Sequence, residues 1–334
     1  MPRLSIVIPV CGNLKRLEDT LVSVLENRPD DSEILVVLDD VYDDPYDLKD
    51  EIRFVEAPRR AGFATSVNLG IAASQAAVVH VLACGAQVRE GWADAALPHF
   101  ADPWVAAVAP LVLEMEDPQR VVSAGLTYRR GGRVRILGQG RPVQAVIEDR
   151  TLVLGPQATA AFYRKSALET VGGFSPLGSE ELTAVDAALR LAYAGFRTVR
   201  EPRCTVHAEC RPRRRRGAFA RAFHAERLFW RWAPCFGWLG SLPAHAAVAT
   251  VELLRSLPRL TPLSELAGRA LGLCYIASGR GHTRELKRIR EAARAAVAAA
   301  AAPHFRPTSA SKVDDISPGC VESPSVRTRK RAVV

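Results

Sequence analysis

Long apolar runs and paired cysteines are both missing from this sequence of 334 residues. No stretch reaches the roughly 20 apolar residues that a membrane-spanning helix needs, and the best candidate, residues 242–258, is interrupted by His245, Glu252 and Arg255. The seven cysteines form no CxxC pair, which argues against a zinc ribbon or a disulfide scaffold and suits a reducing compartment. The apolar run at residues 4–10 is too short for a secretory signal, so we expect a cytoplasmic protein.

Positive charge dominates and is unevenly placed. The net charge is +9, and residues 211–231 carry eight arginines against one glutamate. From Arg284 onward, eleven Lys and Arg residues stand against five acids. Basic clusters attract phosphates in nucleotides, in anionic lipids or in nucleic acids, although a solvated surface is the simplest alternative. No nucleic-acid recognition motif accompanies the charge, so no nucleic-acid partner is expected. An anionic membrane surface, with the protein peripheral at its inner face, is a candidate partner.

The first 115 residues predict the fold class. Five apolar runs alternate with stretches of helical periodicity, and they cover residues 4–10, 33–40, 53–57, 77–83 and 105–113. Runs that are apolar on both faces and alternate with helices predict an α/β fold with a mostly parallel sheet sandwiched by helices. Ligands of such sheets bind at the carboxyl ends of the strands. We therefore expect the chemistry at residues 9–13, 39–44 and 83–87.

The rest of the chain divides by composition. Residues 116–150 are polar and glycine-rich and predict a hairpin or an ordered loop. A strand and a helix are expected in 158–174, a second helix in 182–196, and an edge strand in 198–209, because Pro202 lies inside it. The predicted domains are a sheet domain (1–210), a basic and aromatic helical extension (211–300) and a disordered tail (301–334).

Several segments together resemble the family 2 glycosyltransferases of the GT-A fold. They occur in the expected order over residues 3–208: SIVIPV, VVLDD, AGFATSVNLGI, ALETVGGF, AVDAALRLAYAGF and CTVH. The region after residue 217 resembles the helical extension of bacterial members that work on cell-surface polysaccharides or lipid-linked glycans. The resemblance implies inverting transfer of a hexose from a nucleotide-sugar donor to a glycan or lipid-linked acceptor, in the synthesis of a cell-surface polysaccharide.

The resemblance also implies a donor site. In the family, the end of the first strand and an aspartate after the second hold the base and ribose, and carboxylates suit this because they accept hydrogen bonds from imide and hydroxyl groups. Here these positions are Pro9, Val10 and Asp39, with Asp40 beside it. Alternatively, Asp39 and Asp40 form a turn pair, and His207 is a structural histidine. The full set of expected donor-site residues is Pro9, Val10, Asp39, Asp40, Asn68, Ala83, Gly85, His207 and Arg211.

Two signatures of the family are missing. Its metal-binding Asp-x-Asp falls on Ala83-Cys84-Gly85, which offers no ligand for Mg²⁺ or Mn²⁺. The divalent cation expected of the family therefore has no aspartate ligands here, and we predict no metal-binding residue. The arginines of residues 211–216 are candidates to neutralise a diphosphate in place of the metal.

The family's catalytic base position falls on Ala184, so the base must come from elsewhere. The nearby carboxylates are Glu180, Glu181 and Asp186, and they are the candidate bases that would take a proton from the acceptor hydroxyl. Asp186 can instead form hydrogen bonds within the start of its helix. Because both signatures are missing, two functions stay open: a working glycosyltransferase, and a degenerate member that acts as a binding or scaffold protein.

Overall fold

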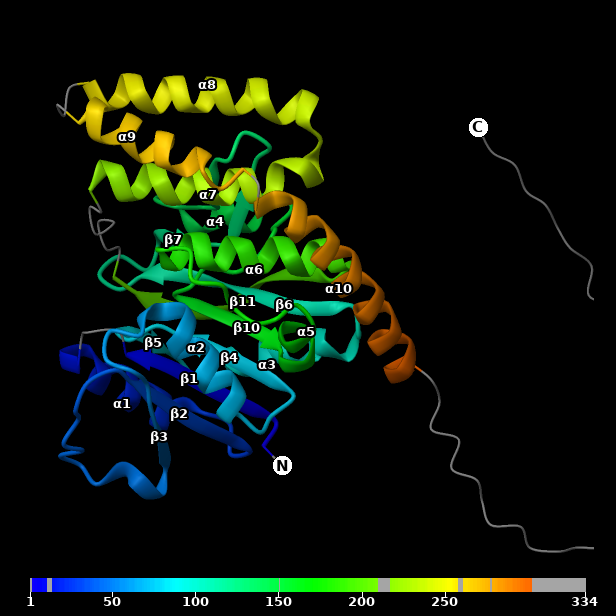
Figure 1. Ribbon diagram of the computed structural model, residues 1–334. Helices are drawn as coiled ribbons and strands as arrows, with labels where there is room; N and C mark the ends of the chain where they lie inside the picture. Colours follow the sequence, from blue (N-terminus) through cyan, green and yellow to red (C-terminus); the bar gives the residue numbers. More distant parts are fainter. Residues whose placement is uncertain are drawn as a thin grey trace, which may run out of the picture. The chain divides into compact units, whose positions relative to one another are not determined.

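The computed structural model describes residues 2–10, 14–149, 151–209, 217–257, 261–276 and 278–301, which belong to one compact unit (Figure 1). The tail expected beyond residue 301 and the arginine cluster at 211–216 lie outside the described residues.

The core of the fold is a nine-stranded sheet in the order β3-β2-β1-β4-β10-β6-β11-β5, with β7 paired to β6. Strands β1 to β4 are parallel to one another where they pair, and β11 is parallel to β6. Strand β10 is antiparallel to both β4 and β6, so these two run the same way. The predicted mostly parallel α/β sheet is therefore confirmed. Its strands are β1 (Leu4–Val10), β2 (Ser32–Leu38), β3 (Ile52–Glu56), β4 (Val78–Leu82), β5 (Ala86–Val88), β6 (Val105–Glu114), β7 (Val121–Ser123), β10 (Ala160–Arg164) and β11 (Arg197–Ala208).

Helices cover both faces of this sheet because its strands are apolar on both sides. In β1, Ile6 and Ile8 pack in a cluster with Leu17 and Trp92, whereas Val7 packs on the other face with Val67. The first face carries η1 (Leu14–Arg16), α1 (Leu17–Asn27), α3 (Trp92–Ala96) and η3 (Leu97–Ala101), and the second carries α2 (Gly62–Ala73), α5 (Lys165–Thr170) and α6 (Glu180–Ala194). Helix η2 (Leu48–Asp50) precedes β3.

Residues 116–150 contain the predicted hairpin. It is formed by β8 (Leu126–Tyr128) and β9 (Val134–Ile136), which pair antiparallel, and is followed by α4 (Val143–Ile147). The expected edge strand over 198–209 is β11, which pairs only with β6 before Val206, whereas β5 covers its other side at residues 206–208. Pro202 is accommodated by an irregularity in the register with β6 between Glu201 and Thr205, where no regular ladder bond is required of it.

Four helices complete the described chain: α7 (Ala218–Phe236), α8 (Trp238–Ser256), α9 (Pro262–Leu273) and α10 (Ser278–Ala301). This confirms the predicted C-terminal helical region. Side chains of α7 and α10, including Trp232 and Leu286, join the core cluster that contains Leu189 of α6. The helices thus pack on one face of the sheet domain. The domain boundary predicted at residue 210 stays a prediction. None of the described helices combines the length and the hydrophobicity required to cross a membrane.

Candidate active site

The carboxyl ends of the parallel strands meet at one edge of the sheet. Val10, Leu38, Leu82 and Ala208 are the last residues of β1, β2, β4 and β11 and lie at this edge. Helix α6 lies along β11, and its carboxyl end leads into the start of that strand (Figure 1). The amino end of α6 therefore points to the same edge. The topology thus brings the ends of β1, β2, β4 and β11 and the start of α6 to one edge of the sheet.

The ends of β1 and β2 lie side by side. Pro9 and Val10 are the register partners of Val37 and Leu38, and both residues are buried. Asp39 follows directly after β2 and is half-buried. The carboxylate of Asp40 accepts the N–H of Val41 at 3.0 Å and lies 3.6 Å from the Arg59 guanidinium. For Asp40 this geometry matches the turn-pair interpretation.

The segment after β4 forms a tight turn. The N–H of Ala83 donates to the carbonyl of Thr159 at 2.8 Å, and the N–H of Gly85 donates to Oγ1 of Thr20 at 2.8 Å. Gly85 has a φ of 90°, in the region that side chains other than glycine rarely adopt. No cluster of three His, Cys, Asp or Glu side chains suited to a metal exists among the described residues. The side chains at this turn do not fit a divalent cation, which requires oxygen ligands.

An arginine, Arg89, follows β5, the short strand that comes after this turn. His207 of β11 is the register partner of Gln87 in β5, and Nε of Arg89 donates to Nε2 of His207 at 3.0 Å. Burial lowers the pKa of His207, and the neighbouring Arg89 lowers it further. The ring is therefore neutral and accepts the bond. Sequence reasoning missed Arg89, because its contact with His207 spans 118 residues and depends on a three-residue strand.

The start of α6 carries two of the candidate bases. Ser179 caps the helix by accepting the N–H of Leu182 at 3.1 Å. Glu180 is exposed and Glu181 is half-buried, both in the first turn, where the helix dipole favours carboxylates. The ring of His224 on α7 lies against Gly178, since a Cβ placed there would approach it to 2.3 Å. Helix α7 therefore borders the place where the two glutamates lie.

Asp186 is not at the surface. It has no solvent exposure. One of its oxygens accepts the Trp232 indole N–H at 2.9 Å and lies 3.4 Å from Nε of Arg231, while the other lies 3.0 Å from Nε of Arg190. This burial corrects the expectation that Asp186 is a candidate base, because an acceptor hydroxyl cannot reach it. It anchors α7 to α6, and Arg190 in turn donates to the carbonyl of Gly173 at 2.6 Å.

Asn68 also has a structural position. Its amide nitrogen donates to the carbonyl of Phe174, and its amide oxygen accepts the N–H of the same residue, both at 2.8 Å. Both polar groups are thus engaged by the loop that leads to α6. This corrects the expectation of a donor-binding side chain. Asn68 ties α2 to the segment before the candidate bases, and Arg211 lies outside the described residues.

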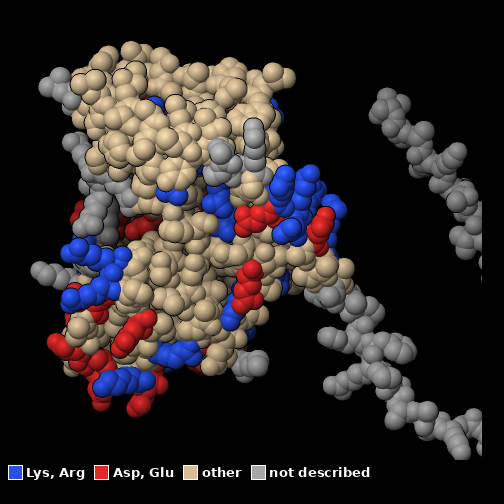
Figure 2. Space-filling view, viewed as in Figure 1, with Lys and Arg blue, Asp and Glu red and all other residues tan. Residues whose placement is uncertain are grey.

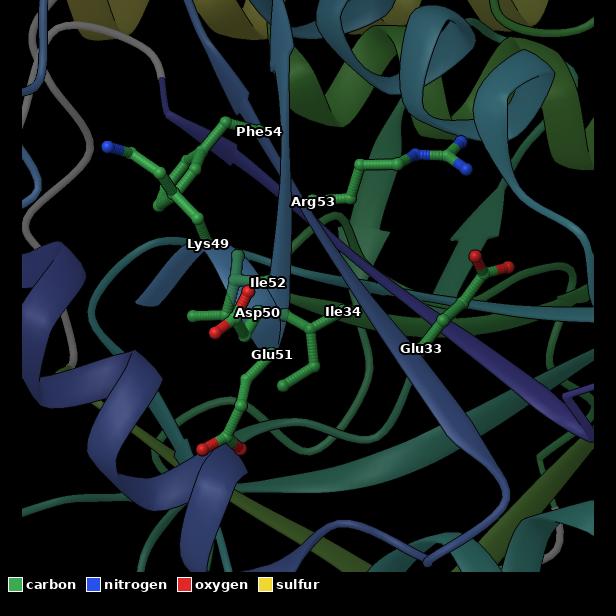
Figure 3. Close-up of a pocket in the computed structure, with 8 residues that line it drawn as sticks. All are labelled: Glu33, Ile34, Lys49, Asp50, Glu51, Ile52, Arg53 and Phe54. Atoms are coloured by element: carbon green, nitrogen blue, oxygen red, sulfur yellow. The ribbon is translucent and has the colours of Figure 1, made fainter. Parts of the chain in front are cut away.

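Two cavities border the sheet domain, one at the edge opposite to the carboxyl ends of the parallel strands and one beside the segment before α6. The larger, of about 530 Å³, is bordered by the first residues of β2 and β3, at the opposite edge of the sheet (Figure 3). Its Glu33 and Arg53 are engaged by the backbone of Gln75 and Ala73. The smaller, of about 320 Å³, borders the segment before α6 and is lined by Leu177, Arg227, Arg231, Tyr275, His282 and Glu285.

The fold and the groups at its carboxyl edge define a GT-A-like protein. The sequence model of the family described as Glycosyl transferase family 2 matches residues 5–172, about half of the chain, and the chain belongs to this family.

Two curated proteins are similar to it. The pre-mycofactocin glycosyltransferase of Mycobacterium tuberculosis is 30% identical over 227 residues, which cover 66% of this chain and 45% of the relative. The mouse polypeptide N-acetylgalactosaminyltransferase 12 is 30% identical over 123 residues, 34% of this chain and 21% of the relative. The chain thus spans less than half the length of the curated relatives it matches.

Two solved structures share the fold. One is GalNAc-T7 with UDP, GalNAc and Mn²⁺, at a TM-score of 0.55 and 15% identity, covering 69% of this chain and 48% of the other. The second is the mannosyltransferase PcManGT of Pyrobaculum calidifontis with GDP-Man and Mn²⁺, at a TM-score of 0.52 and 19% identity. This likeness covers 90% of our chain and 88% of the archaeal one, so it includes part of the helical region.

Proposed function

We propose that this protein transfers a hexose from a nucleotide-sugar donor to an acceptor hydroxyl with inversion at the anomeric carbon. Membership of family 2 supports the reaction class, and two fold relatives hold UDP with GalNAc or GDP-Man. The observation that carries the proposal is the convergence of Asp39, the turn after β4, the Arg89–His207 pair and the start of α6 at one edge of the sheet.

In this proposal the donor lies across the ends of β1, β2 and β4. Asp39 accepts hydrogen bonds from the base or ribose, and backbone groups of Pro9, Val10, Ala83 and Gly85 line the site. Carboxylates and backbone groups suit this task because nucleosides present several N–H and O–H donors.

The diphosphate needs positive charge. The fold relatives contain Mn²⁺, but the described residues at the turn after β4 supply no carboxylate for a cation. We infer that Arg89, oriented by neutral His207, donates to the diphosphate and offsets the charge that grows on it as the sugar leaves. Arg211 and its basic neighbours would add to this charge.

For the transfer step, a carboxylate at the start of α6 takes the proton of the acceptor hydroxyl. The acceptor oxygen forms a bond to the anomeric carbon while the bond from that carbon to the diphosphate oxygen breaks. The electron pair of the broken bond stays on the nucleotide. Glu181 is the better candidate because it is half-buried beside α7, whereas Glu180 is exposed.

The acceptor follows from the resemblance to bacterial family members. We propose a glycan or lipid-linked acceptor in cell-surface polysaccharide synthesis, with the protein at the inner face of the membrane. The competing function is a degenerate member that binds a nucleotide sugar without transfer. Ala184 at the family's base position and the burial of Asp186 favour this second candidate.

Both candidate functions require nucleotide binding. Calorimetric titration with UDP, dTDP and GDP, in Mg²⁺, Mn²⁺ or EDTA, tests whether the site binds a nucleotide at all. Binding that is unchanged by EDTA is expected. For turnover, Glu181→Gln should lower kcat at least tenfold and leave the nucleotide Kd unchanged, since removing a general base costs about 10²–10⁴ in rate. Glu148→Gln, on the exposed end of α4, is the matched control. Nucleotide binding with no release of nucleotide from any sugar donor would favour the degenerate member.

A further inference from the structure

Helices α8 and α9 expose an unusual amount of apolar surface. Twelve of the eighteen large apolar side chains that are exposed in the described residues fall between residues 238 and 276. We define the outer face by six of them: Leu239, Leu242, Leu254, Leu263, Leu266 and Leu271, which are 43–97% exposed. Figure 2 shows this part of the molecule as a broad cap over α8 with very few charged atoms. An apolar patch of this extent marks an interaction surface.

Three of the four charged side chains of the same two helices contact one another, namely Glu252, Glu265 and Arg269, whereas Arg255 is exposed. Arg269 contacts Glu226 of α7 at 2.5 Å, Glu252 at 2.6 Å and Glu265 at 3.3 Å. Glu226 also accepts from His245 at 3.0 Å, and Glu265 is 1% exposed. The helices therefore bury an ion-pair cluster against α7 and turn leucines outward, which is the reverse of the pattern of a helix pair in water.

A basic turn lies beside this face. Between β8 and β9, Arg129, Arg130 and Arg133 are exposed, and none has a carboxylate within 4.0 Å among the described residues. The turn contacts α8: the carbonyl of Gly131 is 2.9 Å from the His245 ring, and the Arg130 guanidinium lies against Gly240, next to Leu239, since a Cβ there would lie 3.4 Å from it. Unpaired arginines beside exposed leucines match a surface that combines negative headgroups with an apolar interior.

We propose that α8 and α9 dock into the interfacial layer of an anionic lipid bilayer. The outer face inserts its leucines at the boundary of headgroups and acyl chains, and Arg129, Arg130 and Arg133 contact the anionic headgroups. The docking is peripheral, since no described helix is long and apolar enough to cross the bilayer. A second copy of the chain fits less well, because it would bring another set of the same arginines rather than opposite charge. The proposal does not depend on the transfer reaction.

The test is flotation of the full chain with vesicles of phosphatidylcholine alone or with about 30% phosphatidylglycerol, an anionic lipid. Binding to the anionic vesicles should be at least tenfold stronger. Changing Leu239, Leu242 and Leu254 together to Asp should weaken it at least tenfold. Leu152→Asp, at an apolar residue that is 89% exposed outside these helices, should leave it unchanged.

The charge arm uses a second set of variants. Changing Arg129, Arg130 and Arg133 to Gln should lower binding to anionic vesicles to the level seen with phosphatidylcholine. The control changes the exposed residues Arg3, Lys49 and Arg197 to Gln, which removes the same net charge elsewhere, and should have no effect. Thermal unfolding verifies that each variant is folded.

Two results would overturn the proposal. One is a wild-type chain that binds neither kind of vesicle. The other is a concentration-dependent dimer that the leucine variant dissociates while vesicle binding is absent, since a second copy would then cover the outer face. Neither result bears on nucleotide binding, which is measured separately, so failure of this proposal and of the proposed transferase function are distinguishable.

Discussion

Replacing Asp186 by Asn tests whether this carboxylate is an anchor or a base. The change keeps the side-chain shape and an oxygen that can accept the Trp232 indole N–H. It removes the negative charge that faces Arg190, whose side chain is 3% exposed, and Arg231, whose side chain is 22% exposed. Removing one partner of a buried ion pair costs about 3–5 kcal/mol, because the other charge is left uncompensated. Against a typical domain stability of about 5–15 kcal/mol, this loss is large.

Urea unfolding followed by circular dichroism measures the loss. Glu148→Gln, an exposed change of the same chemistry, should stay within about 0.5 kcal/mol of wild type. The double variant Asp186→Asn with Arg190→Met should cost less than the sum of the single changes, because the buried charge of Arg190 is no longer left uncompensated and Arg231, which remains, is partly exposed. An Asp186→Asn protein that unfolds within about 1 kcal/mol of wild type, yet has lost turnover with intact nucleotide binding, would refute the anchor role and restore Asp186 as a base.

Two further predictions concern charge at the sheet. Arg89→Gln should weaken UDP or GDP binding about tenfold or more in EDTA, since a hydrogen bond to a charged group is worth about 1.5–3 kcal/mol. Arg197→Gln, at the opposite edge of the sheet, should leave the affinity unchanged. If both variants bind the nucleotide equally well, Arg89 is not part of the donor site. Burial lowers the pKa of His80 to about 3, below its unfolded value, so the unfolded chain binds the extra proton and stability falls as the pH drops below about 6.5. From His80 alone, the free energy of unfolding should be about 2 kcal/mol lower at pH 5 than at pH 7. His80→Phe should flatten that slope in urea titrations, and an unchanged slope would contradict it.

Much of the sheet could be predicted from local pattern. Five apolar runs correspond to β1, β2, β3, β4 and β6, because strands buried on both faces must be apolar throughout. The helix predicted over 182–196 is α6 at 180–194, with Ser179 as its N-cap and Gly195 as its C-cap. The carboxyl edge as the place of the candidate site follows from the same topology, since parallel strands end together.

The side-chain roles could not be predicted in this way. The helical pattern of 182–196 does not tell whether Asp186 faces water, because its partners Arg231 and Trp232 lie on another helix more than 40 residues further along. The contact between Arg89 and His207 likewise depends on a short antiparallel pairing between distant segments. Periodicity shows that a helix has two faces, and only packing decides which of them is buried.

The clearest contrast between sequence and tertiary structure is in α8 and α9. Composition determined that these segments are helical and too interrupted by polar residues to span a membrane. An amphipathic helix ordinarily turns its apolar side to the protein. Only the tertiary structure showed that Glu265 and Arg269 face inward, where Arg269 also pairs with Glu226 of α7, and that the leucines face outward. The direction of a helix face is a property of its neighbours, and the sequence of the helix alone does not contain it.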